Sequence, residues 1–183
     1  MAGNKSKKQD CKSPGLIMVF TGDGKGKTTA AVGQAVRALG HGYRVYMIHF
    51  MKGRDYGEFL ALEKMPGLTL VRAGRDCFVS REDPDPVDVD LARDGFARAG
   101  KAIRGGEYDL VVLDEINVAV DFGLIEADEL IELLRVKPEH VTVVLTGRGA
   151  SQELVKMADM VSEVLAIKHH YEQGADCMLG IEY

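Results

Sequence analysis

The chain has 183 residues, of which 46% are hydrophobic and 28% charged, and its formal net charge is −5. This length and composition predict one globular domain with a buried core, and the negative charge argues against a general nucleic-acid surface. No stretch has the apolar length of a membrane span or a secretion signal. The three cysteines are widely spaced, which favours reduced thiols in a cytoplasmic protein without a membrane anchor.

Residues 1–14 are expected to form a flexible, lysine-rich N-terminal tail. Its lysines are Lys5, Lys7, Lys8 and Lys12. From residue 15 to residue 183 we find no linker, internal repeat or low-complexity segment, and therefore expect a single domain there.

A glycine- and lysine-rich segment at residues 21–29 lies between an apolar strand expected at residues 16–20 and a helix expected at residues 28–39. Glycines there allow consecutive backbone N–H groups to curl around an anion at the helix N-terminus. Lys27 would then reach the phosphates, and the Thr28 hydroxyl would bind Mg²⁺. One position departs from the strict pattern, because Thr21 stands where a phosphate-binding loop usually begins with glycine.

Apolar runs and helical patterns alternate along the rest of the chain. Further strands are expected at residues 43–50, 68–71, 110–113, 141–145, 161–167 and 177–183, and further helices at residues 58–64, 85–105, 127–134 and 151–158. The clearest helix start is Asp85, an N-cap that Pro86 follows, and Gly105 and Gly106 mark the end of that helix. Such alternation predicts an α/β fold with a mostly parallel sheet and helices on both faces.

Ligands of such sheets bind beyond the carboxyl ends of the strands, and polar residues follow several of them here. Asp114 and Glu115 follow the strand at residues 110–113 and are typical of the acidic partner of a phosphate loop, which binds Mg²⁺ directly or through water. Arg148 could clamp a terminal phosphate or a nucleotide hydroxyl, although a surface salt bridge explains it almost as well. For Lys52, a solvated lysine is an equally good interpretation.

Few side chains are convincing general bases. Glu115 is the exception, and this pattern fits either an ATPase that Glu115 activates or a transfer whose nucleophile has no proton to lose. His169 and His170 have no matching ligand cluster in the sequence, so we expect them to be ordinary polar residues.

Four motifs occur together and in order: residues 22–31 in the loop, residues 112–115, residues 146–149 and the ending at residues 180–183. With this set, the chain from about Gly15 to Tyr183 resembles the P-loop type of ATP:corrinoid adenosyltransferase from cobalamin synthesis and salvage. The resemblance implies a P-loop NTPase-like (RecA-like) fold and transfer of the 5′-deoxyadenosyl group of ATP to the cobalt(I) of a corrinoid, with release of triphosphate. Cobalt(I) needs no deprotonation, which agrees with the scarcity of general bases.

The resemblance also implies roles for single residues. It implies that Lys27, Thr28 and Glu115 are the catalytic residues and that Thr28, Glu115 and Asp114 bind Mg²⁺. The expected ATP-phosphate ligands are Gly22, Asp23, Gly24, Lys25, Gly26, Lys27, Thr28, Thr29 and Arg148. Members of the family are typically homodimers, and we expect a flavoprotein as the reductant.

The loop after the third strand departs from the family pattern. Well-known members carry a phenylalanine and a tryptophan there, which help to remove the lower axial ligand of cobalt(II). This chain has no tryptophan, and Phe78 is the aromatic residue of that loop. Phe78 and Lys52 are therefore the residues expected on the corrinoid side.

Two other functions stay open at this stage. One is a P-loop ATPase or kinase that breaks a phosphoanhydride bond, and the other is a module that uses ATP to bind or deliver a corrinoid. The products would distinguish them, because the transferase releases triphosphate, the ATPase releases phosphate with ADP, and the delivery module turns nothing over.

Overall fold

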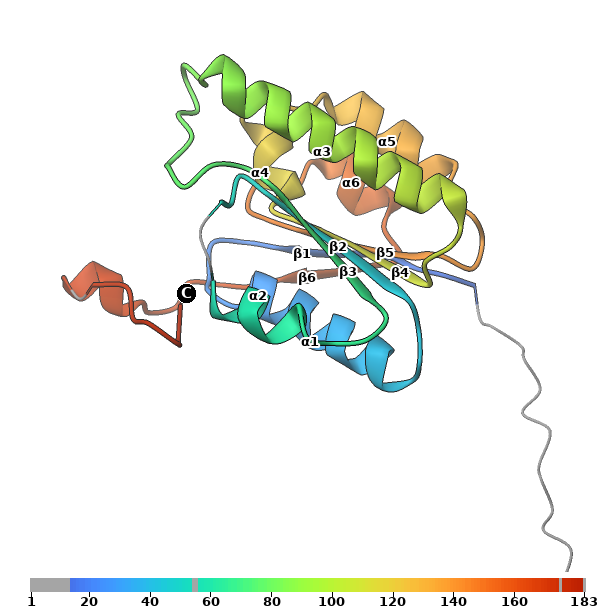
Figure 1. The fold of residues 1–183 in the computed structure, drawn as a ribbon. Coiled ribbons are helices and arrows are strands. Elements are labelled where there is room, and N and C mark those ends of the chain that lie inside the picture. The colour runs from blue at the N-terminus through green and yellow to red at the C-terminus, as the bar shows by residue number, and fades with distance from the viewer. Residues whose placement is uncertain (1–13, 54–55, 175, 183) are drawn as a thin grey trace, which may run out of the picture.

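The computed structural model describes residues 14–53, 56–174 and 176–182, and the lysine-rich segment of residues 1–13 lies outside these ranges (Figure 1). The strands are β1 (Ile17–Thr21), β2 (Val45–Phe50), β3 (Leu68–Ala73), β4 (Leu110–Asp114), β5 (Thr142–Thr146) and β6 (Met160–Glu163). The α-helices are α1 (Lys27–Gly40), α2 (Gly57–Leu62), α3 (Pro86–Gly105), α4 (Ile116–Asp121), α5 (Ala127–Arg135) and α6 (Gln152–Met157), and a 3₁₀ helix η1 spans His170–Gln173.

The six strands form one sheet in the order β3-β2-β4-β5-β1-β6, and each pair of neighbours is parallel. The expected α/β class with a parallel sheet is therefore confirmed. Because β4 lies between β2 and β5, and β1 lies beside β5, the carboxyl ends of these four strands gather along one edge of the sheet. That edge is where the polar residues singled out from the sequence come together.

Helices cover both faces of the sheet (Figure 1). On one face, the alanine side of α1 packs against β-strand residues such as Met47 and Val112, which allows the helix to approach closely. On the other face, α3, α4, α5 and α6 bury a larger apolar cluster, which includes Ile48, Leu113 and Leu145. Burial on both faces accounts for the continuous apolar runs of β2, β4 and β5. In the described parts of the chain, no helix has the length and apolar character needed to cross a membrane.

Two expectations about the C-terminal region were wrong. The strand expected at residues 161–167 is β6, which covers only Met160–Glu163, and residues 177–182 contain no strand. Leu165 and Ile167 are 65% and 92% exposed, so the apolar pattern there does not mark a buried strand. After β6 the chain leaves the sheet edge and crosses the glycine-rich loop, where Gly24 N–H donates to the Val164 carbonyl at 2.7 Å.

Helix α4 was not expected from the sequence, and it follows the end of β4 after Glu115 alone. Helix α3, in contrast, begins and ends as its residues predict. The Asp85 side chain accepts a hydrogen bond from Val87 N–H at 2.9 Å, and Gly106 takes a left-handed conformation with φ 63°.

Gly95 sets how closely α3 approaches the sheet. A Cβ at this position would lie 2.5 Å from the Ala73 Cβ, whereas a Cβ at the exposed α1 residue Gly33 would meet nothing within 4 Å. We expect Gly95→Ala to lower the free energy of unfolding by about 1–3 kcal/mol, because overpacking outweighs the better helix propensity of alanine. The matched change Gly33→Ala should raise it by up to about 1 kcal/mol. Urea unfolding curves measure both, and a stabilised Gly95→Ala protein would contradict this packing.

Candidate functional site

The glycine-rich loop connects β1 to the N-terminus of α1, as the sequence predicts. Thr21 is still a strand residue and pairs with Glu163 of β6, which explains why this position does not need glycine. Gly22 and Gly26 have φ of 92° and 126°, a region that favours glycine. Gly24 is required for a different reason, since a Cβ there would lie 2.6 Å from the Leu165 carbonyl oxygen.

The Lys27 ammonium lies inside this loop. It donates to the carbonyl oxygens of Gly22 and Gly24 at 2.7 and 2.8 Å, and the residue is only 9% exposed. Burial lowers the pKa of Lys27, and the Arg148 guanidinium acts in the same direction, while Glu115 opposes them. The loop therefore holds a poorly hydrated cation, which is well suited to bind an anionic phosphate group.

Asp114, at the end of β4, is fully buried and contacts residues of β2, of the loop after β2 and of β5. Its Oδ1 accepts from the Thr146 hydroxyl at 2.7 Å, and its Oδ2 lies 2.8 Å from both His49 Nδ1 and Lys52 Nζ. Burial alone would raise the pKa of Asp114, but the Lys52 ammonium and the His49 hydrogen bond outweigh burial and hold the pKa well below its usual range. Asp114 is thus an ionised anchor whose two oxygens already have partners.

Glu115 follows at once, in a left-handed conformation with φ 61°. Its backbone N–H donates to the Thr146 hydroxyl at 2.9 Å, which fixes the turn out of the strand. Burial raises the pKa of Glu115, and the neighbouring Asp114 charge raises it further. A bound cation would relieve both effects, so the environment of Glu115 favours a positively charged partner.

In this structure, the positive charge beside Asp114 and Glu115 is the Lys52 ammonium. Its Nζ lies 3.1 Å from Thr28 Oγ1, 2.8 Å from Asp114 Oδ2 and 3.7 Å from Glu115 Oε1. Burial acts to lower the pKa of Lys52, but the two carboxylates raise it to about 12. The structure therefore brings Lys52 among the oxygen atoms expected to bind Mg²⁺, and contact between Lys52 and a corrinoid stays a prediction.

Close packing of two loops holds Lys52 there. A Cβ on Gly74, after β3, would lie 2.4 Å from the Lys52 backbone nitrogen, and one on Gly53 would lie 2.4 Å from the Arg75 carbonyl carbon. Only glycine permits such an approach, so the loops after β2 and β3 support each other.

The donor atoms fit a magnesium site. Thr28 Oγ1 and the Glu115 carboxylate are hard oxygen ligands of the type that Mg²⁺ prefers, and both border the same cavity. Asp114 fits a supporting role better than a direct ligand, because its oxygens are already engaged. Lys52 would have to yield its position for a cation to bind.

A cavity of about 520 Å³ opens above these residues, within the range of small-molecule sites. The glycine-rich loop, the start of α1 and Glu115 line it, together with the C-terminal residues His169, Gly180 and Glu182. Besides Glu115, the site residues expected from the sequence that line this cavity are Asp23, Gly24, Lys25, Gly26, Lys27, Thr28, Thr29, Lys52 and Arg148.

Arg148 and Phe78 are both exposed, and they differ in their position relative to the cavity. Arg148 is exposed at the rim of the cavity, and its Nε lies 3.8 Å from Asp23 Oδ1, a distance that leaves the guanidinium available to a phosphate. Phe78 is fully exposed in the loop between β3 and α3 and does not line the cavity. The structure therefore brings together the loop, the acidic pair and Arg148, but not Phe78.

Sequence reasoning missed the supporting roles of His49, Thr146 and Asn117, which are all buried. His49 and Asn117 are polar residues within apolar runs, and Thr146 ends one, so these polar positions were the available signal. Asn117, in α4, donates to the Gly147 carbonyl at 3.2 Å and so supports the turn that carries Arg148. The ending at residues 180–183 was singled out only as a family motif, and its position at the cavity could not be predicted because it depends on where the chain goes after β6.

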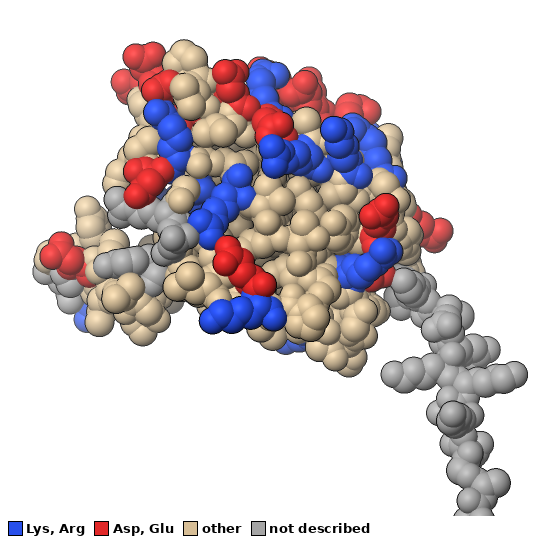
Figure 2. Space-filling view, in the orientation of Figure 1, with Lys and Arg blue, Asp and Glu red and all other residues tan. Residues whose placement is uncertain are grey.

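Charged side chains are mixed on the face shown in Figure 2, where basic and acidic residues are interspersed rather than gathered into one basic band.

Comparison with known proteins identifies relatives over nearly the whole chain. The family described as ATP:corrinoid adenosyltransferase BtuR/CobO/CobP matches residues 13–183. The corrinoid adenosyltransferase of Escherichia coli is 35% identical over 170 residues, which cover 92% of this chain and 86% of that protein. The corrinoid adenosyltransferase CobA of Salmonella typhimurium is 36% identical with the same coverage. An uncharacterized Nostoc protein is 40% identical over 182 residues, covering 92% of this chain and 48% of its own length.

The position of Lys52 predicts competition between its ammonium and a divalent cation. Two like charges about 4 Å apart repel by on the order of 4 kcal/mol at an effective dielectric constant of about 20. We therefore expect Lys52→Met to tighten Mn²⁺ binding to the nucleotide-free protein by about tenfold or more, as measured by electron paramagnetic resonance. Lys25→Met, which removes an exposed charge from the same cavity, is the matched control and should change binding much less. Equal Mn²⁺ affinity in Lys52→Met and wild type would show that Lys52 does not occupy the cation site.

Proposed function

The chain belongs to the ATP:corrinoid adenosyltransferase family and is an ATP-dependent corrinoid adenosyltransferase, and we propose that its phosphate-loop cavity holds ATP for this reaction. The observation that carries the assignment of the site is the convergence of Lys27, Thr28 and Glu115 on one cavity of about 520 Å³. The family match does not favour the ATPase, kinase or delivery alternatives.

The reaction forms a bond between cobalt(I) and the ribose 5′ carbon of ATP. The carbon–oxygen bond to the triphosphate breaks, and its electron pair leaves with the triphosphate. Catalysis then consists of aligning the two substrates and stabilising the charge that develops on the leaving group. No protein base is required, because the attacking cobalt carries no proton.

Lys27 and the loop backbone would stabilise that leaving group. The Lys27 ammonium, now bound to the Gly22 and Gly24 carbonyls, would exchange these partners for phosphate oxygens. The free backbone N–H groups at the start of α1 add the positive end of the helix dipole. Arg148 at the cavity rim would contact the outer phosphates, since its Nε lies 3.8 Å from Asp23 Oδ1 in the phosphate loop.

Thr28 and Glu115 would hold Mg²⁺, with Asp114 fixing the end of β4 beneath them. Bound Mg²⁺ would neutralise part of the triphosphate charge. Lys52 would then turn toward the phosphates or the corrinoid, and its displacement would couple metal binding to a change in this part of the cavity wall.

Phe78 is proposed to contact the corrinoid. Its loop is tied at both ends, because Arg75 forms two hydrogen bonds to Asp88 at 2.8 and 2.7 Å and Arg81 pairs with Asp121 at 2.9 Å. These contacts hold the loop while Phe78 itself stays fully exposed. When a flat apolar ligand covers a large apolar ring that is otherwise held in water, the free energy of the system falls because apolar surface is buried.

A homodimer, a flavoprotein reductant and a cytoplasmic location are further proposals. Exposed apolar side chains of the C-terminal segment support the first, since burial against a second copy would remove them from water. They are Leu165, Ile167, Met178, Leu179 and Ile181.

The reaction and the role of Lys27 are tested together. Incubation with ATP, Mg²⁺ and chemically reduced cobalamin should give the cobalt–carbon product, seen by its absorption spectrum, and one triphosphate for each product. Lys27→Ala should lower turnover by about a hundredfold or more, because it removes a cation directed at the leaving group. Phosphate and ADP as products would disprove the transfer. Near-normal turnover of a folded Lys27→Ala protein would disprove only the assigned site.

The role of Phe78 is tested by comparing the reaction that starts from the cobalt(II) corrinoid with the reaction that starts from the cobalt(I) corrinoid. If its ring excludes water and an axial ligand from cobalt, Phe78→Ala should impair the reaction that starts from cobalt(II) with a mild reductant. The same variant should be affected much less when cobalt(I) is supplied ready-made, because alkyl transfer itself uses the phosphate site. Equal impairment in both assays would mean that Phe78 serves general binding.

A further inference from the structure

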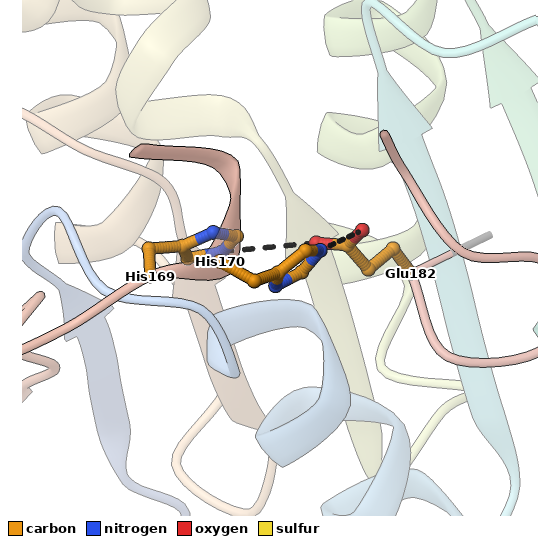
Figure 3. A group of neighbouring side chains, drawn as sticks. All are labelled: His169, His170 and Glu182. Carbon is orange, nitrogen blue, oxygen red and sulfur yellow. Dashed lines mark hydrogen bonds and ion pairs between the residues drawn. The ribbon is translucent and has the colours of Figure 1, made fainter. Parts of the chain in front are cut away.

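A cluster of three side chains lies beside the nucleotide cavity, outside the proposed magnesium site. His169 and His170 lie at the start of η1, and Glu182 is near the C-terminus (Figure 3). Glu182 Oε2 lies 3.1 Å from His170 Nε2, and Glu182 Oε1 lies 3.7 Å from His169 Nε2. The two rings stack with centroids 4.7 Å apart, so both present the same edge to the carboxylate.

The composition of this cluster is that of a transition-metal site. Two imidazoles and one carboxylate suit Zn²⁺ and its first-row neighbours, whereas Mg²⁺ avoids nitrogen ligands. In tetrahedral zinc sites with bonds of about 2.0–2.1 Å, ligand atoms lie about 3.3 Å apart. The distances of 3.1 and 3.7 Å, each to a different oxygen of Glu182, are close to that spacing, and one ligand atom of each residue lies within 4.8 Å of the other two.

The surroundings also orient the ligands. Met178 N–H donates to Glu182 Oε2 at 3.0 Å, which fixes the orientation of the carboxylate. The side chains of His169, His170 and Glu182 are 26%, 34% and 13% exposed, so an ion can reach them from solvent. Binding through His169 Nε2 would place the ring proton on Nδ1 and end only one long hydrogen bond, from Tyr171 N–H at 3.3 Å.

We propose that His169, His170 and Glu182 bind one divalent transition-metal ion, with Zn²⁺ as the representative ion. With three protein ligands, the ion keeps a position for water. Because His169 and Glu182 also line the nucleotide cavity, the ion joins the two ends of the C-terminal segment at its rim. The site thus restrains a wall of the cavity, and it does not depend on which reaction takes place inside.

The test is direct metal binding to the full chain, purified without a histidine tag and treated with EDTA. Titration with Zn²⁺ by calorimetry, and with Co²⁺ by visible spectroscopy, is done in excess Mg²⁺ so that the oxygen-rich site at Thr28 and Glu115 is saturated. We expect one ion per chain. Binding should weaken by about tenfold or more in His170→Ala and in Glu182→Gln, because each removes one of three ligands.

Two control variants keep the result specific. His41→Ala removes an exposed histidine at the end of α1 and should leave the affinity unchanged. Cys177→Ser removes a thiol that lines the same cavity and should also leave it unchanged. Loss of binding in Cys177→Ser, or equal affinity in wild type and His170→Ala, would overturn the proposed ligand set. If wild type binds no stoichiometric metal ion, the proposal is wrong, and the three side chains only interact with one another.

Discussion

The buried carboxylate of Asp114 is the interaction on which the rest of the site depends. Through Lys52, His49 and Thr146 it connects the ends of β2, β4 and β5, and Lys52 continues the connection to Thr28 at the start of α1. A fully buried charge is tolerated only where it is paired and hydrogen-bonded, so these partners cannot move independently. One anion thereby holds together four elements that are distant in the chain, and the cavity forms where they meet.

The glycine-rich loop is also constrained by the segment that follows β6. Residues 163–165 pass so close to Gly22 and Gly24 that a Cβ on either glycine would collide with backbone. The loop is therefore shaped by its neighbour before any phosphate arrives, and it costs less free energy to order when a nucleotide binds. The same segment leads on to His169 and Glu182, so the loop and the C-terminal wall of the cavity belong to one continuous arrangement.

Lys27 and Lys52 have partners that a bound ligand could replace. Lys27 now bonds to carbonyl oxygens of its own loop, and Lys52 lies between oxygen atoms suited to a metal ion. Both ammonium groups are largely withdrawn from water, yet each has partners that a phosphate or a divalent cation could replace. Such an arrangement keeps the ligand-free site stable, because Asp114 and Glu115 are not left uncompensated, and it favours ligands of high charge.

Local sequence determined the elements and predicted many of the residues that line the cavity. Apolar runs predicted β1 to β5, Asp85 and Gly106 marked the ends of α3, and the glycine-rich residues from Gly22 to Thr28 predicted the turn between β1 and α1. These features depend on residues close together in the chain, so their physical causes are visible in the sequence. Tertiary structure alone decided that residues 177–182 form no strand, that Lys52 lies among the oxygen atoms beside Thr28, and that Glu182 meets His169 and His170. Each of these depends on which strand ends are neighbours and on where the chain goes after β6, and such contacts between distant segments leave no local pattern.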